Sequence, residues 1–110
     1  MRGIMIDLPT QIKIGAIQWH IHKDSRALQY EGLKGETLYQ ARTIRIDDEI
    51  PIPLQQETVL HETLHALCVP LTEDIQLSET QVRYFAAALM QVFMDNPKLR
   101  DFLFQEDDNG

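Results

Sequence analysis

The residues with the clearest chemical meaning form the stretch His61-Glu62-Thr63-Leu64-His65, an H-E-x-x-H pattern. On a helix, two side chains four residues apart lie one turn apart on the same face. Both imidazoles can therefore reach one zinc ion, and Glu62 lies beside that ion, where a general base for a zinc-bound water must be. The pattern predicts hydrolytic zinc chemistry.

A zinc site of this kind needs a third protein ligand. Glu79 is the best placed candidate, because it precedes Val82 by three residues and Ala86 by seven and so heads the apolar stripe of the next predicted helix. An acid in that position is costly unless it is paired or bound to metal. The alternative is a first-turn carboxylate favoured by the helix dipole. We favour the ligand, and we interpret the loop acids Glu73 and Asp74 as solvated.

Three further side chains have metal-binding chemistry but a simpler structural interpretation. Cys68 falls on the same helical face as His61 and His65, yet three ligands from one straight helix would strain tetrahedral coordination, so we expect a core thiol. His20 and His22 form H-x-H on a predicted strand with no further ligand evident. We expect both to lie on a solvated face of the sheet.

Two tyrosines and two arginines complete the set of candidates. The phenols of Tyr39 and Tyr84 can in principle stabilise a tetrahedral intermediate, but half-buried packing is the simpler prediction. Arg42 and Arg45 lie near the last predicted strand, and either binds substrate or balances charge. We favour charge balance for both.

The composition of the chain limits the kind of fold that can position these residues. The chain has 110 residues, a hydrophobic fraction of 44%, and one cysteine, which fits one domain over residues 1–110 in a reducing compartment. The net charge of −7 argues against nucleic acid and against an anionic membrane surface as partners. The sequence contains no apolar segment long enough to span a membrane, and we expect a cytoplasmic protein.

The first half of the chain has the period-two pattern of strands, so residues 1–50 predict a sheet. In residues 11–23 the apolar parity changes at Gly15-Ala16, which predicts a bulge or a tight turn. Residues 35–46 predict a second hairpin with its turn around Tyr39–Arg42, and the stretch between the hairpins is interpreted as a linker.

The second half has helical periodicity. Residues 54–69 predict the H-E-x-x-H helix, with Leu60, Leu64 and Leu67 as its apolar stripe. Ser78 predicts the N-cap of a second helix over residues 78–95. Its predicted core stripe is Val82, Phe85, Ala86, Leu89, Val92 and Phe93. We expect a short helical segment over residues 98–104 and a frayed tail over 105–110.

Together these elements predict an α+β fold, with a small antiparallel sheet of three to five strands packed on two main helices. The H-E-x-x-H segment followed by Glu79-Thr80-Gln81-Val82-Arg83-Tyr84-Phe85-Ala86-Ala87-Ala88-Leu89 resembles the ImmA/IrrE-type metallopeptidases of bacteria and their phages, which are gluzincin-like. The resemblance covers residues 54–95, and residues 35–46 also resemble the short sheet before the active helix in small phage and prophage members.

The resemblance implies a zinc ion held by His61, His65 and Glu79, with Glu62 as the catalytic acid and base. It implies a peptide substrate from an intracellular protein of a bacterial host, in some members a repressor, lying along an edge strand at residues 43–46. The alternative is a non-enzymatic small phage or prophage protein that keeps zinc as a structural staple and binds a protein partner. The sequence does not indicate an oligomeric state.

Overall fold

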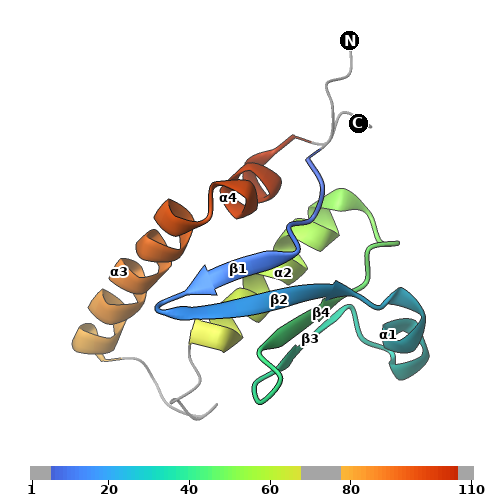
Figure 1. Cartoon of the computed structure of the whole chain (residues 1–110), viewed down its shortest axis with the longest axis horizontal. Helices are drawn as coiled ribbons and strands as arrows, with labels where there is room; N and C mark the ends of the chain where they lie inside the picture. The colour runs from blue at the N-terminus through green and yellow to red at the C-terminus, as the bar shows by residue number, and fades with distance from the viewer. Residues whose placement is uncertain (1–5, 68–77, 107–110) are drawn as a thin grey trace.

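The computed structural model describes residues 6–67 and 78–106, without the side chains of Glu79 and Val82. The elements in chain order are β1 (Gln11–Ile14), β2 (Ile17–Lys23), α1 (Ser25–Glu31), β3 (Gly35–Leu38), β4 (Thr43–Ile46), α2 (Ile52–Leu67), α3 (Glu79–Asp95) and α4 (Pro97–Phe104). Figure 1 shows α2 crossing one face of the sheet, with α1 and α3 at opposite ends of the molecule.

The strands form one four-stranded sheet in the order β1-β2-β4-β3. The β1–β2 and β3–β4 pairs are antiparallel hairpins, whereas β2 and β4 run parallel, with Ile21 opposite Ile44. Of the bulge and the tight turn that the parity change allowed, the tight turn is present: Gly15 and Ala16 form the two-residue loop between β1 and β2, and Gly15 takes a φ of 63°. The α+β class is confirmed, but the sheet is mixed rather than antiparallel throughout.

The parallel pairing comes from α1, which the sequence analysis treated as part of a linker. This seven-residue helix buries only Leu28 and ends at Gly32, whose φ of 75° is the usual left-handed helix end. It joins the end of β2 to the start of β3 at the same end of the sheet, and β4 lies between these two strands. The expectation that residues 43–46 form an edge strand is therefore wrong, because β4 is paired on both sides and β3 is the edge on this side.

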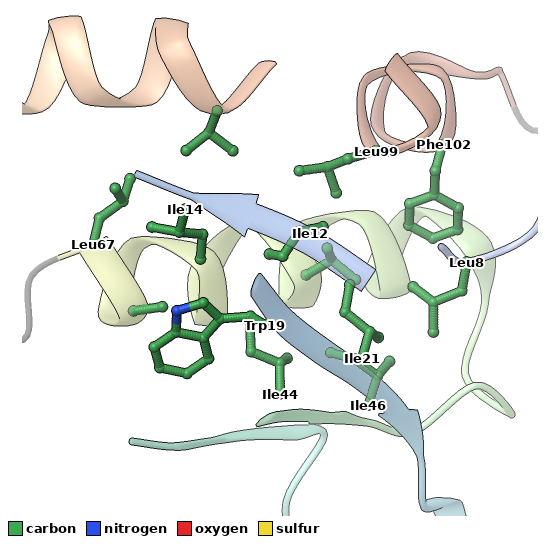
Figure 2. Packing of buried hydrophobic residues seen from close by; sticks show 13 residues of the cluster. Leu8, Ile12, Ile14, Trp19, Ile21, Ile44, Ile46, Leu67, Leu99 and Phe102 are labelled. Atoms are coloured by element: carbon green, nitrogen blue, oxygen red, sulfur yellow. The ribbon is translucent and has the colours of Figure 1, made fainter. Parts of the chain in front are cut away.

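One core joins the sheet to the helices. Figure 2 shows its buried side chains converging from β1, β2 and β4 on α2 and α4. The members of this core are Leu8, Ile12, Ile14, Trp19, Ile21, Ile44, Ile46, Val59, Ala66, Leu67, Val92, Leu99 and Phe102. The described helices include none that is long and apolar enough to cross a membrane.

Helix α3 begins as predicted. The Ser78 hydroxyl accepts a hydrogen bond from the Gln81 backbone N–H, and the Gln81 side chain accepts one from the Ser78 N–H, which completes a capping box. The predicted core stripe is only partly correct, because Val92 is buried, Phe85, Leu89 and Phe93 are half-buried, and Ala86 is exposed. Helix α3 contacts β1 and α4, so burial is strongest near its C-terminal end.

The other face of the sheet carries an ionic cluster centred on Arg45 of β4. Its guanidinium donates a hydrogen bond of 2.9 Å to Asp24 and one to Glu36, and lies 3.6 Å from Glu31. The hydrogen bond with Glu36 raises the pKa of Arg45, against an opposing effect of burial. Arg45 therefore balances charge, as predicted, and joins α1 to β3 and β4.

Replacing Arg45 with Met is expected to lower the free energy of unfolding by about 1 kcal/mol, because three carboxylates then face one another without a cation. Because folding raises the pKa of Arg45, the stability that this residue contributes is fully present at every pH below the ordinary arginine pKa. The loss of unfolding free energy in the variant should therefore stay constant between about pH 5 and 9. Urea denaturation measures it. Arg26→Met, at an exposed position of α1, is the control, and equal losses in the two variants would contradict the prediction.

Candidate metal centre

The face that α2 turns to the sheet differs from the predicted leucine stripe. Leu64 is 38% exposed and Leu60 is half-buried, whereas Glu62 is 7% exposed. The buried positions are Gln55, Thr58, Val59, Glu62, Thr63, Ala66 and Leu67. Leu67 alone of the predicted stripe is buried, so that prediction was largely wrong. The actual orientation brings the carboxylate of Glu62 inside and leaves His61 and His65 on the outer side.

Small side chains explain this orientation, because they let α2 approach the edge strand closely. A Cβ atom placed on Gly35 of β3 would lie 2.6 Å from Cγ2 of Thr58, 3.2 Å from Cγ of Glu62, and 3.2 Å from the Arg45 carbonyl oxygen. Only glycine fits this approach without displacement of the helix. Gly35 therefore sets the distance between β3 and the H-E-x-x-H helix.

The two predicted histidine ligands converge. Nε2 of His61 lies 3.1 Å from Nε2 of His65, and both rings are exposed. Two imidazole nitrogens bound to one tetrahedral zinc ion, each at about 2.0–2.1 Å, lie roughly 3.3 Å apart. The nitrogen separation thus fits a shared zinc ion with little rearrangement. The i, i+4 spacing on α2 produces this arrangement, as the sequence predicted.

The carboxylate of Glu62 is held beside this histidine pair. Its Oε1 accepts a hydrogen bond of 2.7 Å from the Thr37 hydroxyl of β3, which also lies 3.1 Å from the Glu62 backbone oxygen. Its Oε2 lies 3.8 Å from Nε2 of His61. One carboxylate oxygen is therefore anchored to the sheet, while the other faces the histidines.

The third predicted ligand is located only by its backbone. Glu79 is the first residue of α3, and its side chain lies outside the described part of the structure, as do Cys68, Glu73 and Asp74. Among the side chains that are described, no three from His, Cys, Asp and Glu form a metal-binding group. The described centre thus consists of two imidazoles and one buried carboxylate.

A pocket of about 330 Å³ opens beside this centre. It lies between α2 and the chain that enters β3, and its lining includes Leu33, Gly35, Leu54, Thr58, His61 and Glu62. Exposed leucines on both sides give the pocket apolar walls, since Leu33 is 40% and Leu54 37% exposed. His61 and the Glu62 carboxylate are therefore at the wall of a cavity with room for part of a ligand.

The remaining candidates lie elsewhere. His20 and His22 are exposed on β2, whereas Trp19, which precedes them, and Ile21, which lies between them, are buried. The predicted solvated histidine face is therefore confirmed. Tyr39 and Tyr84 do not line the pocket beside Glu62 but a second one at the opposite end of β3.

Sequence reasoning missed two residues of this centre, Gly35 and Thr37. Both were predicted only as part of the hairpin over residues 35–46. Their contacts with Glu62 depend on β3 being the strand next to α2. The period-two pattern cannot reveal which strand is the neighbour, so spacing alone held no signal for them.

No protein-family model, no curated protein and no solved structure matches this chain.

Proposed function

We propose that this protein is a zinc-dependent metallopeptidase that hydrolyses a peptide bond in an intracellular protein. The observation that carries the proposal is the approach of three groups on α2: two histidine nitrogens 3.1 Å apart and the buried Glu62 carboxylate 3.8 Å from one of them. A zinc site that serves only as a structural staple has no need of that carboxylate. The ImmA/IrrE resemblance and a cytoplasmic location belong to the same proposal.

Each residue of the centre then has a role. His61 and His65 would hold the metal, and Glu79 at the start of α3 would be the third ligand. Zinc, when bound, acidifies a water molecule and polarises a carbonyl oxygen. Glu62 takes a proton from the attacking water and returns it to the leaving amine, which gains a proton as the peptide bond breaks. Thr37 is a positioning residue, because its hydroxyl fixes one carboxylate oxygen and leaves the other free.

The edge of β3 supports a polypeptide as the substrate class. A strand with one unpaired edge can accept an extended segment through main-chain hydrogen bonds. Among the described strands β3 pairs only with β4, and its residue Thr37 contacts Glu62 directly. A segment added along β3 therefore passes beside the carboxylate, whereas β4, the strand first expected to receive it, is enclosed on both sides.

Metal analysis tests the proposed site. We expect the wild-type chain, dialysed against excess zinc and then against metal-free buffer, to keep one zinc ion per chain. His61→Ala should lose it, and Glu79→Gln should bind it more weakly. His20→Ala removes an exposed histidine of β2 and should behave as the wild type. A wild-type chain without stoichiometric zinc, or a His61→Ala chain that keeps it, would overturn the proposal.

Thr37 gives a separate test of the positioning role. Thr37→Val removes the hydroxyl but keeps the shape, so we expect kcat on a cleaved peptide to fall about tenfold while KM stays the same, a loss typical of one hydrogen bond to a charged group. Thr37→Ser should retain the wild-type kcat. A purely structural role for Thr37 would instead predict equal effects on kcat and KM, or a loss that Ser does not restore.

A further inference from the structure

A second pocket, of about 390 Å³, lies at the end of β3 away from the pocket beside Glu62. It lies between the two hairpin turns, the last turn of α2 and one face of α3. Its apolar walls include Ile14, Trp19, Leu67 and Ala88, and its polar lining includes Arg42. Trp19 and Tyr39 meet edge to face in its wall, with ring centroids 6.4 Å apart. A cavity of this size and lining suits a large apolar side chain.

Arg42 is unusual in two respects. It is exposed at the pocket and makes no ion pair with the residues that the structure describes, although acids outnumber bases in this chain by 17 to 10. It also has a φ of 51°, the left-handed region that glycine occupies more easily. For an arginine this conformation is strained. Its N–H and carbonyl nevertheless bond to Tyr39 and to His20 of β2, so the turn holds the cation in place.

The position of the pocket relative to β3 suggests what fills it. Gly35 begins β3 at the pocket beside Glu62, and Tyr39 follows the strand at the second pocket. Four residues of extended chain cover about 13 Å. A polypeptide paired with the outer edge of β3 beside Glu62 can therefore reach the second pocket with a residue only a few positions along its own sequence.

We propose that the second pocket binds a large apolar side chain of the substrate polypeptide and that Arg42 binds the carboxylate of an acidic residue next to it. This inference rests on the proposed peptidase function and names its substrate class. The guanidinium and a carboxylate form a charge-assisted, two-point contact. The net charge of −7 repels acidic peptides in general. The protein would therefore accept a substrate carboxylate only at the position that Arg42 contacts.

The test uses the single tryptophan, Trp19, as reporter, because it lines the pocket. The probes are N-acetyl-Phe-Asp-amide and N-acetyl-Phe-Asn-amide, which differ only in the charge. Binding to the zinc-free wild-type chain is followed by Trp19 fluorescence and by the Trp19 indole signal in a ¹H–¹⁵N NMR spectrum. We expect the Asp probe to bind at least about tenfold tighter than the Asn probe.

Arg42→Gly should abolish this preference and at the same time raise stability to urea, because glycine suits a φ of 51°. Arg42→Lys should keep part of the preference, and Arg26→Ala in α1 should keep all of it. Equal affinities for the two probes, no response to either, or an Arg42→Gly chain that still prefers Asp would overturn the inference. Because binding is measured without zinc, this result is independent of the metal analysis that tests the peptidase proposal.

Discussion

Replacing Glu62 with Gln is expected to lower peptide cleavage by about 10²–10⁴-fold, the usual contribution of a positioned general base. Gln has the same shape and keeps an oxygen that can accept the hydrogen bond from Thr37, so the fold and the bound zinc should be unchanged. The change removes only the ability to take a proton. Cleavage would be measured by mass spectrometry on a library of peptides from a bacterial proteome, which requires no prior choice of substrate.

The same variant distinguishes the two functions considered for this chain. Asp101→Asn, an exposed acid-to-amide change on α4, is the matched control and should cleave as the wild type does. If Glu62→Gln and the wild type give the same cleavage pattern, the carboxylate has no catalytic role. A zinc-bound wild type that cleaves nothing would favour the structural staple with a protein partner.

Replacing Gly35 with Ala is expected to lower the free energy of unfolding by about 1–3 kcal/mol, as overpacking of a close contact does. In a strand, replacing glycine with alanine normally raises the free energy of unfolding by roughly 0.5–1 kcal/mol. The loss expected here is therefore opposite in sign to the effect of backbone propensity. The new methyl would lie 2.6 Å from Cγ2 of Thr58 and 3.2 Å from Cγ of Glu62. Displacement of α2 should also disturb the Thr37–Glu62 hydrogen bond and lower cleavage.

A second substitution makes this prediction specific. Thr58→Ser removes the Cγ2 methyl but keeps the hydroxyl, which donates a hydrogen bond of 2.7 Å to the Leu54 carbonyl. We therefore expect Gly35→Ala with Thr58→Ser to recover most of the lost stability in urea denaturation. Gly32→Ala is the control, because its loss comes from a φ of 75° with no atom nearby, and Thr58→Ser should not restore it. Additive effects of Gly35→Ala and Thr58→Ser would contradict the steric explanation.

The sequence predicted correctly what local signals encode. The Gly15 turn, the hairpin turning at Tyr39–Arg42, the Ser78 cap and the helical position of His61 and His65 all depend on residues a few positions apart. The proximity of the two imidazoles is likewise local, because the i, i+4 spacing alone brings them together.

What the sequence did not predict depends on which elements are neighbours. The leucine stripe of α2 suggested that Leu64 faces the core, but the close approach to Gly35 favours a face of small residues and buries Glu62 instead. The parallel pairing of β4 with β2 requires the connection from β2 to β3 through α1, whose single buried residue, Leu28, leaves almost no periodic signal. The edge strand was therefore assigned to β4 instead of β3.

The described residues of the candidate centre all lie in one unbroken stretch, from Gly35 on β3 to His65 on α2. Everything in this unit is close in sequence, so its folding involves short loops and low entropic cost. During synthesis, a nascent chain can assemble β3, β4 and α2 before α3 has left the ribosome. We expect the arrival of Val92, Leu99 and Phe102 to close the core last, onto a candidate centre already formed.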